Sequence, residues 1–500
     1  MRLFVGAKLA KELILGLDFG TSSVKGIFID FEGHILKRVE SKIETTYSMG
    51  NHAEQEALDY LVALRDITSS NSELIKQVIS VGLSGQTPSV VCSDENGNPV
   101  RPVLIWQDNR ATSEAEELAD AFGNPLATIG TSLPWSASAC PAKMHWLSRN
   151  EKETVRKTRW IFQPKDFVGF HLTGNAISDP WSSKGLCNVQ TKKAITELLA
   201  FTGWNDRVMP ELLDGFQSRG VITAEAAAIF GFKIGTEVSV GWSDAMCGMA
   251  AMGVFSETAT FIITGTSAIV GSSSHTPPAD GGGLYIIPDS CAPLAVTYGP
   301  TQSSGSSIAW AAELFGIDAG ELIDSALEAS DSELPIYLPY INGERAPLWR
   351  PDLQGGFYGL SSECKKPQMA LAVMEGISFA ERQVAELAEN LNSATQPSIL
   401  LGGHAGNDYR WEKIRHRTLG RKIERFEDID TTTRGSAMLA HAVITKDFST
   451  SCKTLSFKPI VTEPASTDLM YSEAKFREFL IAQEYAIDLA NRKRKSTDEN

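Results

Sequence analysis

The chain has 500 residues, too many for a single hydrophobic core, so we expect two or more domains. Hydrophobic residues make up 42% and charged residues 21%, as in ordinary globular proteins, and no apolar run is long enough to span a membrane. The net charge of −15 argues against non-specific binding to nucleic acid or to an anionic membrane.

The first residues and the cysteines favour a reducing compartment. The opening "MRLFVGAKLAKEL" is too short and too interrupted by lysine for a signal peptide. The seven cysteines include no C-x-x-C pair and no histidine partners at zinc spacing, which argues against disulfides and structural zinc. We therefore expect a cytoplasmic protein with reduced cysteines.

Two apolar runs near the start, residues 13–17 and 24–29, predict strands joined by "DFGTSS". This connection combines Asp18 with the turn Gly20-Thr21-Ser22, which is either an ordinary hairpin or a cradle for an anion. Backbone N–H groups and hydroxyls of such a turn can bind phosphates, and Asp18 would then hold Mg²⁺ through water. For this turn alone the ordinary hairpin is the favoured interpretation.

The same turn recurs as Gly265-Thr266-Ser267, about half a chain length later and again between apolar runs. The repeat suggests an internal duplication, and the alternating strand and helix patterns that follow each turn predict α/β layers. The main predicted elements are a strand at 78–86, a hairpin around Asn96-Gly97 followed by a strand ending at Trp106, a helix at 112–122, a strand at 398–403, a helix from 407 to 420 and a frayed polar end at 491–500.

The stretch "VSVGWSDAMCGMAAMG" places Asp244 between a strand ending at Val240 and a helix rich in small residues. Asp at this position is most often a helix N-cap. Alternatively, it is a carboxylate at the end of a strand that accepts a proton from a substrate hydroxyl. On this motif alone the cap is favoured. No Walker A sequence and no G-x-G-x-x-G after a strand occurs, so any phosphate site must use another device.

An ordered series of motifs resembles the FGGY family of carbohydrate kinases. "GGFYGLSSECKKPQMALAVME" (355–375) fits the C-terminal signature of this family, and "SACPAKMHWLSRNE" (138–151) is similar to its N-terminal signature. "LDFGTSSVKG", "GLSGQ", "LIWQDNR", "GWSDAMCG", "GTSAIV", "NGERAP" and "LLGGHAGN" follow the family order between about residues 13 and 445. The resemblance makes phosphate binding the preferred interpretation of Asp18 and the two turns.

The resemblance implies two actin-like (ribonuclease-H-like) α/β domains with a catalytic cleft between them. The sugar would bind mainly to the N-terminal domain, 13–246, and ATP mainly to the C-terminal domain, 247–488, with 489–500 as a polar tail. ATP and Mg²⁺ are the implied cofactors and a small sugar or polyol the implied substrate. No nucleic acid or membrane partner is expected, and a homodimer is left open.

The resemblance also assigns roles to individual positions. Asp244 matches the catalytic base, and Asp18 matches the second catalytic residue, which would hold Mg²⁺ through water. Expected sugar contacts, besides Asp244, are Gln86, Thr87, Trp106 and Asp108. Expected nucleotide and phosphate contacts are Gly20, Thr21, Ser22, Lys25, Gly265, Thr266, Ser267, Gly305, Gly402, Gly403 and Asn407.

Several positions depart from the family pattern on the substrate side. Thr87-Pro88 replaces the Met-His of xylulokinases and the Arg-Glu of glycerol kinases, Ser138 replaces a tyrosine of glycerol kinases, and Ala245 replaces Asn or Gln. Because polar contacts dominate discrimination among hydroxylated ligands, these departures leave the sugar open. We expect an ATP-dependent kinase acting on a ketopentose such as xylulose or ribulose. The alternatives are a non-catalytic sugar- and nucleotide-binding regulator and another actin-like ATPase, such as a chaperone.

Overall fold

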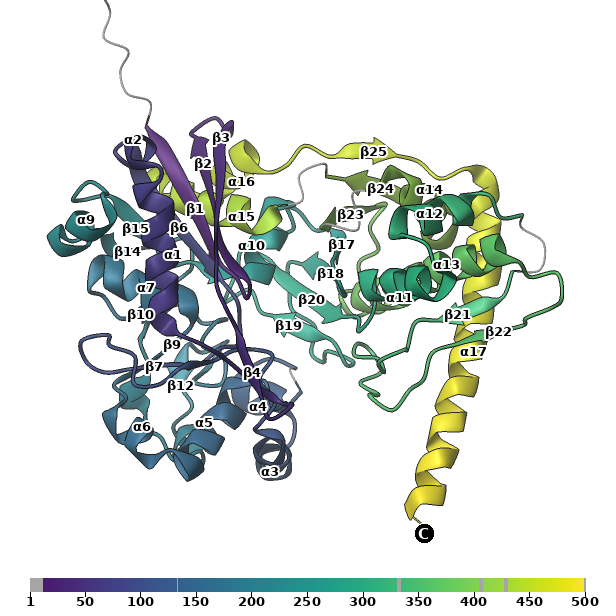
Figure 1. The fold of residues 1–500 in the computed structure, drawn as a ribbon, viewed down its shortest axis with the longest axis horizontal. Coiled ribbons are helices and arrows are strands. Elements are labelled where there is room, and N and C mark those ends of the chain that lie inside the picture. Colours follow the sequence, from purple (N-terminus) through teal and green to yellow (C-terminus); the bar gives the residue numbers. More distant parts are fainter. Residues whose placement is uncertain (1–11, 133, 331–333, 404–407, 427–429, 499–500) are drawn as a thin grey trace, which may run out of the picture. The chain divides into compact units, whose positions relative to one another are not determined.

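The computed structural model describes residues 12–498 apart from 133, 331–333, 404–407 and 427–429, and it separates into two compact units (Figure 1). Unit 1 comprises Met1–Ser256, Ser290–Pro293 and Asp430–Ser456. Unit 2 comprises Glu257–Asp289, Leu294–Ile429 and Phe457–Asn500. The segment 430–456 therefore belongs to unit 1, although it follows most of unit 2 in the chain. The predicted division of the chain at residue 246 assigns this segment to the C-terminal domain.

Unit 1 is built on a seven-stranded sheet with the order β14-β15-β6-β1-β2-β3, in which β16 also pairs with β6. These strands are β1 (Leu13–Phe19), β2 (Ser23–Asp30), β3 (Ile35–Lys42), β6 (Val78–Gly85), β14 (Ser218–Val221), β15 (Glu237–Ser239) and β16 (Trp242–Ser243). Shorter strands are β4 (Thr46–Ser48), β5 (His52–Gln55), β7 (Val91–Ser93), β8 (Val103–Leu104), β9 (Trp160–Phe162), β10 (Ile177–Ser178), β11 (Cys187–Asn188), β12 (Lys193–Ala194) and β13 (Glu211–Leu212). Strand β1 is antiparallel to β2 and parallel to β6, and its side chains are all buried.

The helices of unit 1 cover this sheet and build the smaller layers around it. They are α1 (Ala57–Ser69), α2 (Ser72–Ile75), α3 (Thr112–Phe122), α4 (Pro125–Ile129), α5 (Cys140–Asn150), α6 (Lys152–Lys157), α7 (Pro164–Thr173), α8 (Thr196–Phe201), the 3-10 helix η1 (Asp206–Val208), α9 (Ala224–Phe230), α10 (Asp244–Ala251), α15 (Thr431–Thr445) and α16 (Phe448–Leu455). Apolar side chains of β1, β6, α1 and α7 form one continuous core.

Unit 2 is built on a seven-stranded sheet with the order β19-β20-β18-β17-β23-β24-β25. Its strands are β17 (Thr260–Thr264), β18 (Ala268–Ser274), β19 (Tyr285–Ile287), β20 (Ala295–Pro300), β23 (Ser398–Gly403), β24 (Lys422–Arg425) and β25 (Ile460–Thr462), with β21 (Ile336–Leu338) and β22 (Gly356–Tyr358) in a separate ribbon. Its helices are α11 (Gly305–Phe315), α12 (Ala319–Leu327), α13 (Lys366–Leu391), α14 (Tyr409–Leu419) and α17 (Ser466–Asp498).

The two sheets repeat one topology. The order β3-β2-β1-β6-β15-β14 in unit 1 corresponds to β20-β18-β17-β23-β24-β25 in unit 2. In both units the first three of these strands form an antiparallel meander, the next two continue parallel to its last strand, and the outermost strand is antiparallel. The duplication expected from the two Gly-Thr-Ser turns is confirmed at the level of strand order.

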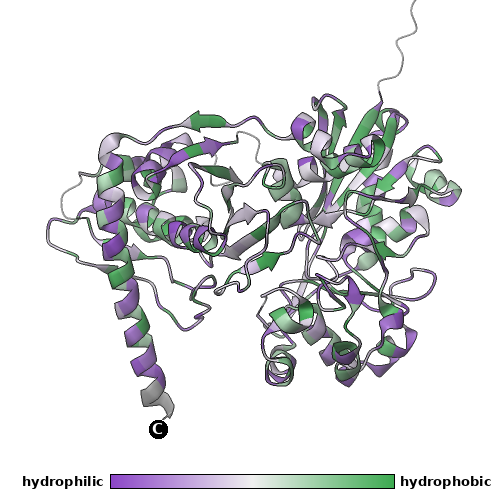
Figure 2. Ribbon diagram, turned by 180° about the vertical axis from the view of Figure 1, so that it is seen from behind, coloured by the Kyte–Doolittle hydropathy of each residue, from purple (hydrophilic) through white to green (hydrophobic). Residues whose placement is uncertain are grey.

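Most elements predicted from the sequence are found, but the C-terminal end of the chain differs from the prediction. The expected helix at 112–122 is α3, and the expected strand at 398–403 is β23. The prediction of a frayed end at 491–500 is wrong for the described part, because α17 continues to Asp498. Figure 2 shows hydrophilic and hydrophobic residues alternating along this helix. Arg494 forms an ion pair with Asp352 at 2.8 Å, which fastens the end of α17 to unit 2.

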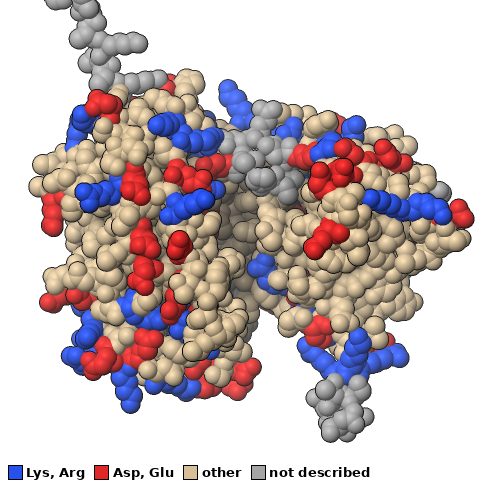
Figure 3. Space-filling view, viewed as in Figure 1, with Lys and Arg blue, Asp and Glu red and all other residues tan. Residues whose placement is uncertain are grey.

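The surface carries charges of both signs. Figure 3 shows Lys and Arg interspersed with Asp and Glu over the visible face of each unit, without a broad patch of one sign. Among the described residues, no helix is long and apolar enough to cross a membrane.

Candidate active site

The predicted catalytic carboxylates of unit 1 lie at the carboxyl ends of neighbouring parallel strands. Asp18 on β1 pairs in register with Ser84 on β6, and Ser84 pairs on its other side with Trp242 on β16. Asp244 follows Trp242 by two residues and begins α10. Since carboxyl ends of parallel strands meet at one edge of a sheet, this arrangement brings Asp18 and Asp244 to the same edge.

Asp18 is held from two elements that are far apart in the sequence. The Ser84 hydroxyl donates to Oδ1 at 2.8 Å, and the Thr432 hydroxyl at the start of α15 donates to Oδ2 at 3.1 Å. Burial raises the pKa of Asp18 to about 6, the two hydroxyl hydrogen bonds oppose this rise, and the nearby carboxylate of Asp430 adds to it. The carboxyl group is only 7% exposed and forms no ion pair among the described residues.

This environment fits a divalent cation. A buried carboxylate held by hydroxyls, beside a second acid, is an oxygen-rich and electronegative site of the kind that Mg²⁺ prefers. A cation there would lower the pKa of Asp18 and remove the repulsion from Asp430.

Three glycines allow α15 and α10 to reach this edge of the sheet. A Cβ on Gly82 of β6 would lie 1.7 Å from the Ser436 carbonyl oxygen, and one on Gly16 of β1 would lie 2.3 Å from the Thr433 carbonyl oxygen. A Cβ on Gly435 of α15 would meet the Cys247 carbonyl oxygen of α10 at 1.9 Å. Any side chain at these positions would push apart the elements that carry Thr432, Asp18 and Asp244.

Asp244 is the first residue of α10 and does not cap it. The N-cap is Ser243, whose hydroxyl accepts a hydrogen bond from the Met246 N–H at 3.4 Å. The cap interpretation of Asp244 is therefore wrong, because the preceding serine already fills that role. Asp244 Oδ1 accepts the N–H of Ala245 at 2.7 Å.

The electrostatic environment of Asp244 suits proton transfer. Burial raises the pKa of Asp244 to about 7, and repulsion from Asp18 adds to the rise, whereas the Ala245 N–H and the ammonium of Lys184 oppose it. Lys184 donates to the Trp181 carbonyl oxygen at 3.1 Å, and its Nζ lies 4.8 Å from the centroid of the Trp181 ring. A carboxylate with a pKa near the working pH is well matched to the role of general base.

Two residues predicted near the substrate, Trp106 and Gln86, form one hydrogen-bonded group with Thr21, a predicted phosphate contact. The Trp106 indole N–H donates to Thr21 Oγ1 at 2.9 Å, and Thr21 Oγ1 donates to Gln86 Oε1 at 3.1 Å. Gln86 is 1% exposed, and its amide also donates to Gln55 at 2.8 Å. Trp106, which is 41% exposed, is the member that can present a surface to a ligand. Gln86 is linked to Trp106 through the Thr21 hydroxyl.

Asp108 holds other parts of unit 1 in place through its hydrogen bonds. It is fully buried, and Oδ2 accepts the Ala53 N–H at 2.7 Å and the Arg110 guanidinium at 2.8 Å. Burial raises the pKa of Asp108, but the hydrogen bonds from Arg110 and from the Ala53 N–H, together with the positive charge of Arg110, outweigh this effect and lower the pKa. Its occupied, buried carboxylate disfavours the direct sugar contact that the sequence predicts. Thr87 follows Gln86 on the same segment.

The predicted nucleotide residues of unit 2 converge around the second turn. The Gly305 N–H at the start of α11 donates to the Gly265 carbonyl oxygen at 3.0 Å, and the Ser306 N–H donates to the Thr266 carbonyl oxygen at 3.0 Å. Gly403, with φ +86°, lies so close to Thr264 that a Cβ would meet its carbonyl oxygen at 2.1 Å.

This turn has features of an anion site. The hairpin presents the exposed side chain of Thr266 beside the N-terminus of α11, where the helix dipole favours negative charge. The buried hydroxyls of Ser303 and Ser306 have no hydrogen-bond partner among the described residues. Gly402 pairs in register with Ile263, so the glycine pair of β23 also borders the turn. These features fit a phosphate group. Asn407 lies outside the described residues.

The remaining predicted positions are spread along the hairpin of unit 1. Ser22 and Lys25 are exposed, Gly20 is half-buried, and Lys25 lies in register opposite Asp18. Ser138 contacts Ser136 through its hydroxyl at 3.0 Å.

Sequence reasoning missed Ser84, Thr432 and Asp430, which surround Asp18. Ser84 stands in the quoted "GLSGQ" motif and could have been found from it. Thr432 and Asp430 gave no local signal, because they reach the site only through the packing of α15 on β1 and β6.

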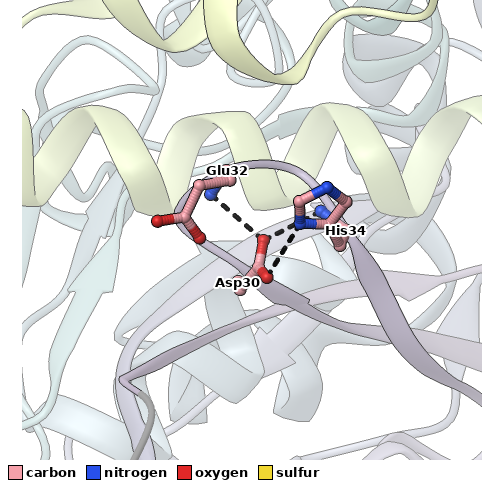
Figure 4. Close-up of side chains that lie close together, drawn as sticks. All are labelled: Asp30, Glu32 and His34. Carbon is pink, nitrogen blue, oxygen red and sulfur yellow. Dashed lines mark hydrogen bonds and ion pairs between the residues drawn. The ribbon is translucent and has the colours of Figure 1, made fainter.

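A second acidic group, Asp30, Glu32 and His34, lies at the turn between β2 and β3 (Figure 4). Asp30 Oδ1 accepts the backbone N–H groups of Glu32 at 3.1 Å and His34 at 2.9 Å, and Oδ2 lies 3.1 Å from His34 Nδ1. These contacts close the turn, and Glu32 and His34 are exposed. The group is explained by the hairpin and is not assigned to the active site.

Comparisons with known proteins identify the family of this chain. The N-terminal domain of the FGGY family of carbohydrate kinases matches residues 13–253, and its C-terminal domain matches residues 260–443. The chain is 28% identical over 404 residues to a xylulose kinase of Lactococcus lactis, covering 79% of this chain and 80% of the relative. It is 29% identical over 403 residues to an erythritol kinase of Brucella abortus, covering 74% and 76%.

The fold is that of solved sugar kinases. A xyloylose kinase from Brucella ovis superposes with a TM-score of 0.88 at 24% identity, covering 96% of this chain and 100% of that one. The two-unit α/β architecture is thus the actin-like, ribonuclease-H-like fold. With both family domains matched, the chain belongs to the FGGY family of carbohydrate kinases.

Proposed function

We propose that this kinase transfers the γ-phosphoryl group of ATP to a hydroxyl of a small sugar or polyol, with a ketopentose such as xylulose or ribulose as the favoured substrate. The observation that carries the proposal is Asp244, a half-buried carboxylate with a pKa raised to about 7, at the same sheet edge as Asp18. The similarity to xylulose kinases supports the choice of substrate class.

The chain's own residues account for proton transfer and orientation. Asp244 accepts the proton of the attacking hydroxyl as the phosphoryl group moves in line. Its Oδ1 is oriented by the Ala245 N–H, which leaves Oδ2 for the substrate. Asp18, with Ser84 and Thr432, would hold Mg²⁺, and the bound ion would neutralise charge on the phosphates.

The turn Gly265-Thr266-Ser267 is the favoured phosphate contact of unit 2. The Gly265 N–H already donates to the Ser267 carbonyl oxygen at 2.8 Å, so the N–H groups of Thr266 and Ser267 and the Thr266 hydroxyl would be the donors to a phosphate. The dipole of α11 adds a favourable field. Phosphoryl transfer depends mainly on positioning and charge stabilisation, so these donors matter even though they do no covalent chemistry.

Relatives that are named for different substrates leave two sugar classes to separate. Xylulose kinases and an erythritol kinase match the chain at similar identity. The ketopentose is favoured because several xylulose kinases from different bacteria match over more than four fifths of the chain.

A coupled assay of ADP formation tests the proposal. The purified protein is incubated with ATP and Mg²⁺, and xylulose, ribulose, erythritol, glycerol and gluconate are added separately. We expect rapid ADP formation with a ketopentose and little without an acceptor. ADP formation that is equal with and without every acceptor would contradict it. Tight binding of sugar and nucleotide without turnover would instead favour the non-catalytic regulator.

A further inference from the structure

Lys143 of α5 is an ammonium group buried in an apolar part of unit 1. Its side chain is 0% exposed, and no described carboxylate forms an ion pair with it. Its neighbours in α5, Met144 and Leu147, belong to a hydrophobic cluster that also contains Leu104. Burying a charged group without a counter-ion is unfavourable unless strong acceptors replace water, so a lysine here needs a specific explanation.

Two backbone carbonyls supply those acceptors. Lys143 Nζ donates to the Ile105 carbonyl oxygen at 2.7 Å and to the Pro88 carbonyl oxygen at 3.1 Å. Burial lowers the pKa of Lys143 to about 8, so the amine still carries its proton at pH 7. The ammonium therefore bridges two chain segments that are separated by 17 positions in the sequence.

Both segments carry residues that the family resemblance predicts as sugar contacts. Ile105 immediately precedes Trp106, the exposed aromatic side chain, and Pro88 immediately follows Thr87. The segments also exchange backbone hydrogen bonds between Val90 and Leu104, at 2.9 and 3.2 Å. Lys143 extends this pairing beyond the point where the backbone ladder ends.

The residue at position 88 is a proline, which has few groups through which it can be held by hydrogen bonds. Proline has no N–H and no polar side chain, so its carbonyl oxygen is the one polar group by which this residue can be held. One turn away on α5, Cys140 Sγ lies 3.4 Å from the Ser89 carbonyl oxygen. The helix thus holds two successive carbonyl groups of the segment that begins at Thr87.

We propose that Lys143 is a positioning residue of the sugar site, which fixes Trp106 and Thr87 relative to each other through the carbonyl groups of Ile105 and Pro88. The inference rests on the proposed function, since it assumes that these segments contact the acceptor sugar. It adds a residue that acts on sugar affinity through the backbone, without touching the sugar or ATP.

Three substitutions separate positioning from packing. Lys143→Met keeps the unbranched chain and removes every donor, Lys143→Gln keeps a shorter donor, and Lys143→Arg keeps a cation with several donors. Ile67→Ala, in the core of unit 1 on α1, is the matched control for loss of stability alone. The KM for sugar, the KM for ATP, kcat and the melting temperature are measured for each variant.

We expect the KM for sugar to rise as hydrogen-bond donors are removed from the side chain at position 143. We expect Lys143→Met to raise it about tenfold or more, Lys143→Gln to raise it less and Lys143→Arg to recover part of the loss, with the KM for ATP within about twofold throughout. Ile67→Ala should lower the melting temperature and leave the KM for sugar unchanged.

Two results would overturn the proposal: an unchanged KM for sugar in Lys143→Met, or KM values that follow melting temperature instead of donors. If one variant does not fold, the ranking of the other two still decides. An absence of sugar-dependent ADP formation by the wild-type protein would contradict the proposed function itself. Normal wild-type turnover with an unaffected Lys143→Met variant would contradict this inference alone.

Discussion

Replacing Asp244 with Asn is expected to reduce activity and to stabilise the protein at the same time. The amide keeps the size of the side chain and can still accept the Ala245 N–H through Oδ1. It cannot accept a proton from a substrate hydroxyl. General-base catalysis typically contributes about 10²–10⁴-fold, so kcat should fall by roughly two orders of magnitude or more.

The gain in stability follows from the raised pKa of Asp244, about 7 compared with 3.8 for an ordinary Asp side chain. Between these values the folded state binds more protons than the unfolded state, so the free energy of unfolding decreases as pH rises through this range. A difference of one in pKa equals about 1.4 kcal/mol, which sets a ceiling of roughly 4 kcal/mol above pH 7. Because the side chain is half-buried and water screens part of the effect, we expect about 1–3 kcal/mol.

Thermal melts at pH 4.5, 6 and 8, without nucleotide or metal, measure this effect beside kcat. The stability advantage of Asp244→Asn should be small at pH 4.5 and largest at pH 8. Asp108→Asn is the control of opposite sign, since the hydrogen bonds from Arg110 lower the pKa of Asp108 and its removal should destabilise the protein at neutral pH. A destabilised Asp244→Asn protein with nearly normal kcat would exclude both a raised pKa of Asp244 and its role as the general base.

Three further substitutions test other parts of the account. Thr266→Val removes an exposed hydroxyl from the second turn, and we expect a higher KM for ATP; unchanged KM and kcat would exclude a phosphate contact. Trp106→Ala should raise the KM for sugar and leave the KM for ATP nearly unchanged, whereas equal changes in both would indicate general unfolding. Gly82→Ala places a methyl group against the backbone of Ser436 and should cost more than about 3 kcal/mol in urea denaturation; a stability close to wild type would contradict the packing of α15.

Helices and turns whose sequence pattern lies within the element itself could be predicted from the sequence. The amphipathic stretch at 112–122 is helix α3, and the two Gly-Thr-Ser turns close the β1-β2 and β17-β18 hairpins. The strand order of the sheets could not be read from the sequence. It depends on pairings between residues far apart, such as Asp18 with Ser84.

The hydrogen-bond partners of Asp18 likewise could not all be predicted from the sequence. Thr432 lies 414 positions from Asp18 and reaches it because Gly16 and Gly82 let α15 pack closely on β1 and β6. A polar side chain at a helix start is usually interpreted as a cap, and nothing nearby in the sequence indicates this second partner. Long-range packing, and not local propensity, decides that contact.

The two wrong predictions also have physical causes. The motif alone favours Asp244 as a cap, against the role that the family resemblance gives it, but Ser243 is an equally good cap and stands one residue earlier. The polar end of the chain was expected to fray, but its charged residues have partners outside the helix. Lys493 donates to Gln354 at 2.8 Å, and Arg494 pairs with Asp352.

The central claim is that a sugar hydroxyl accepts the phosphoryl group with Asp244 as the base. Its most direct test is the stoichiometry of ADP and sugar phosphate formed from ATP and xylulose or ribulose, by wild-type protein and by Asp244→Asn. We expect one sugar phosphate for each ADP in the wild type and a rate at least about 100-fold lower in the variant. ADP formed without sugar phosphate, or equal rates in both proteins, would contradict it.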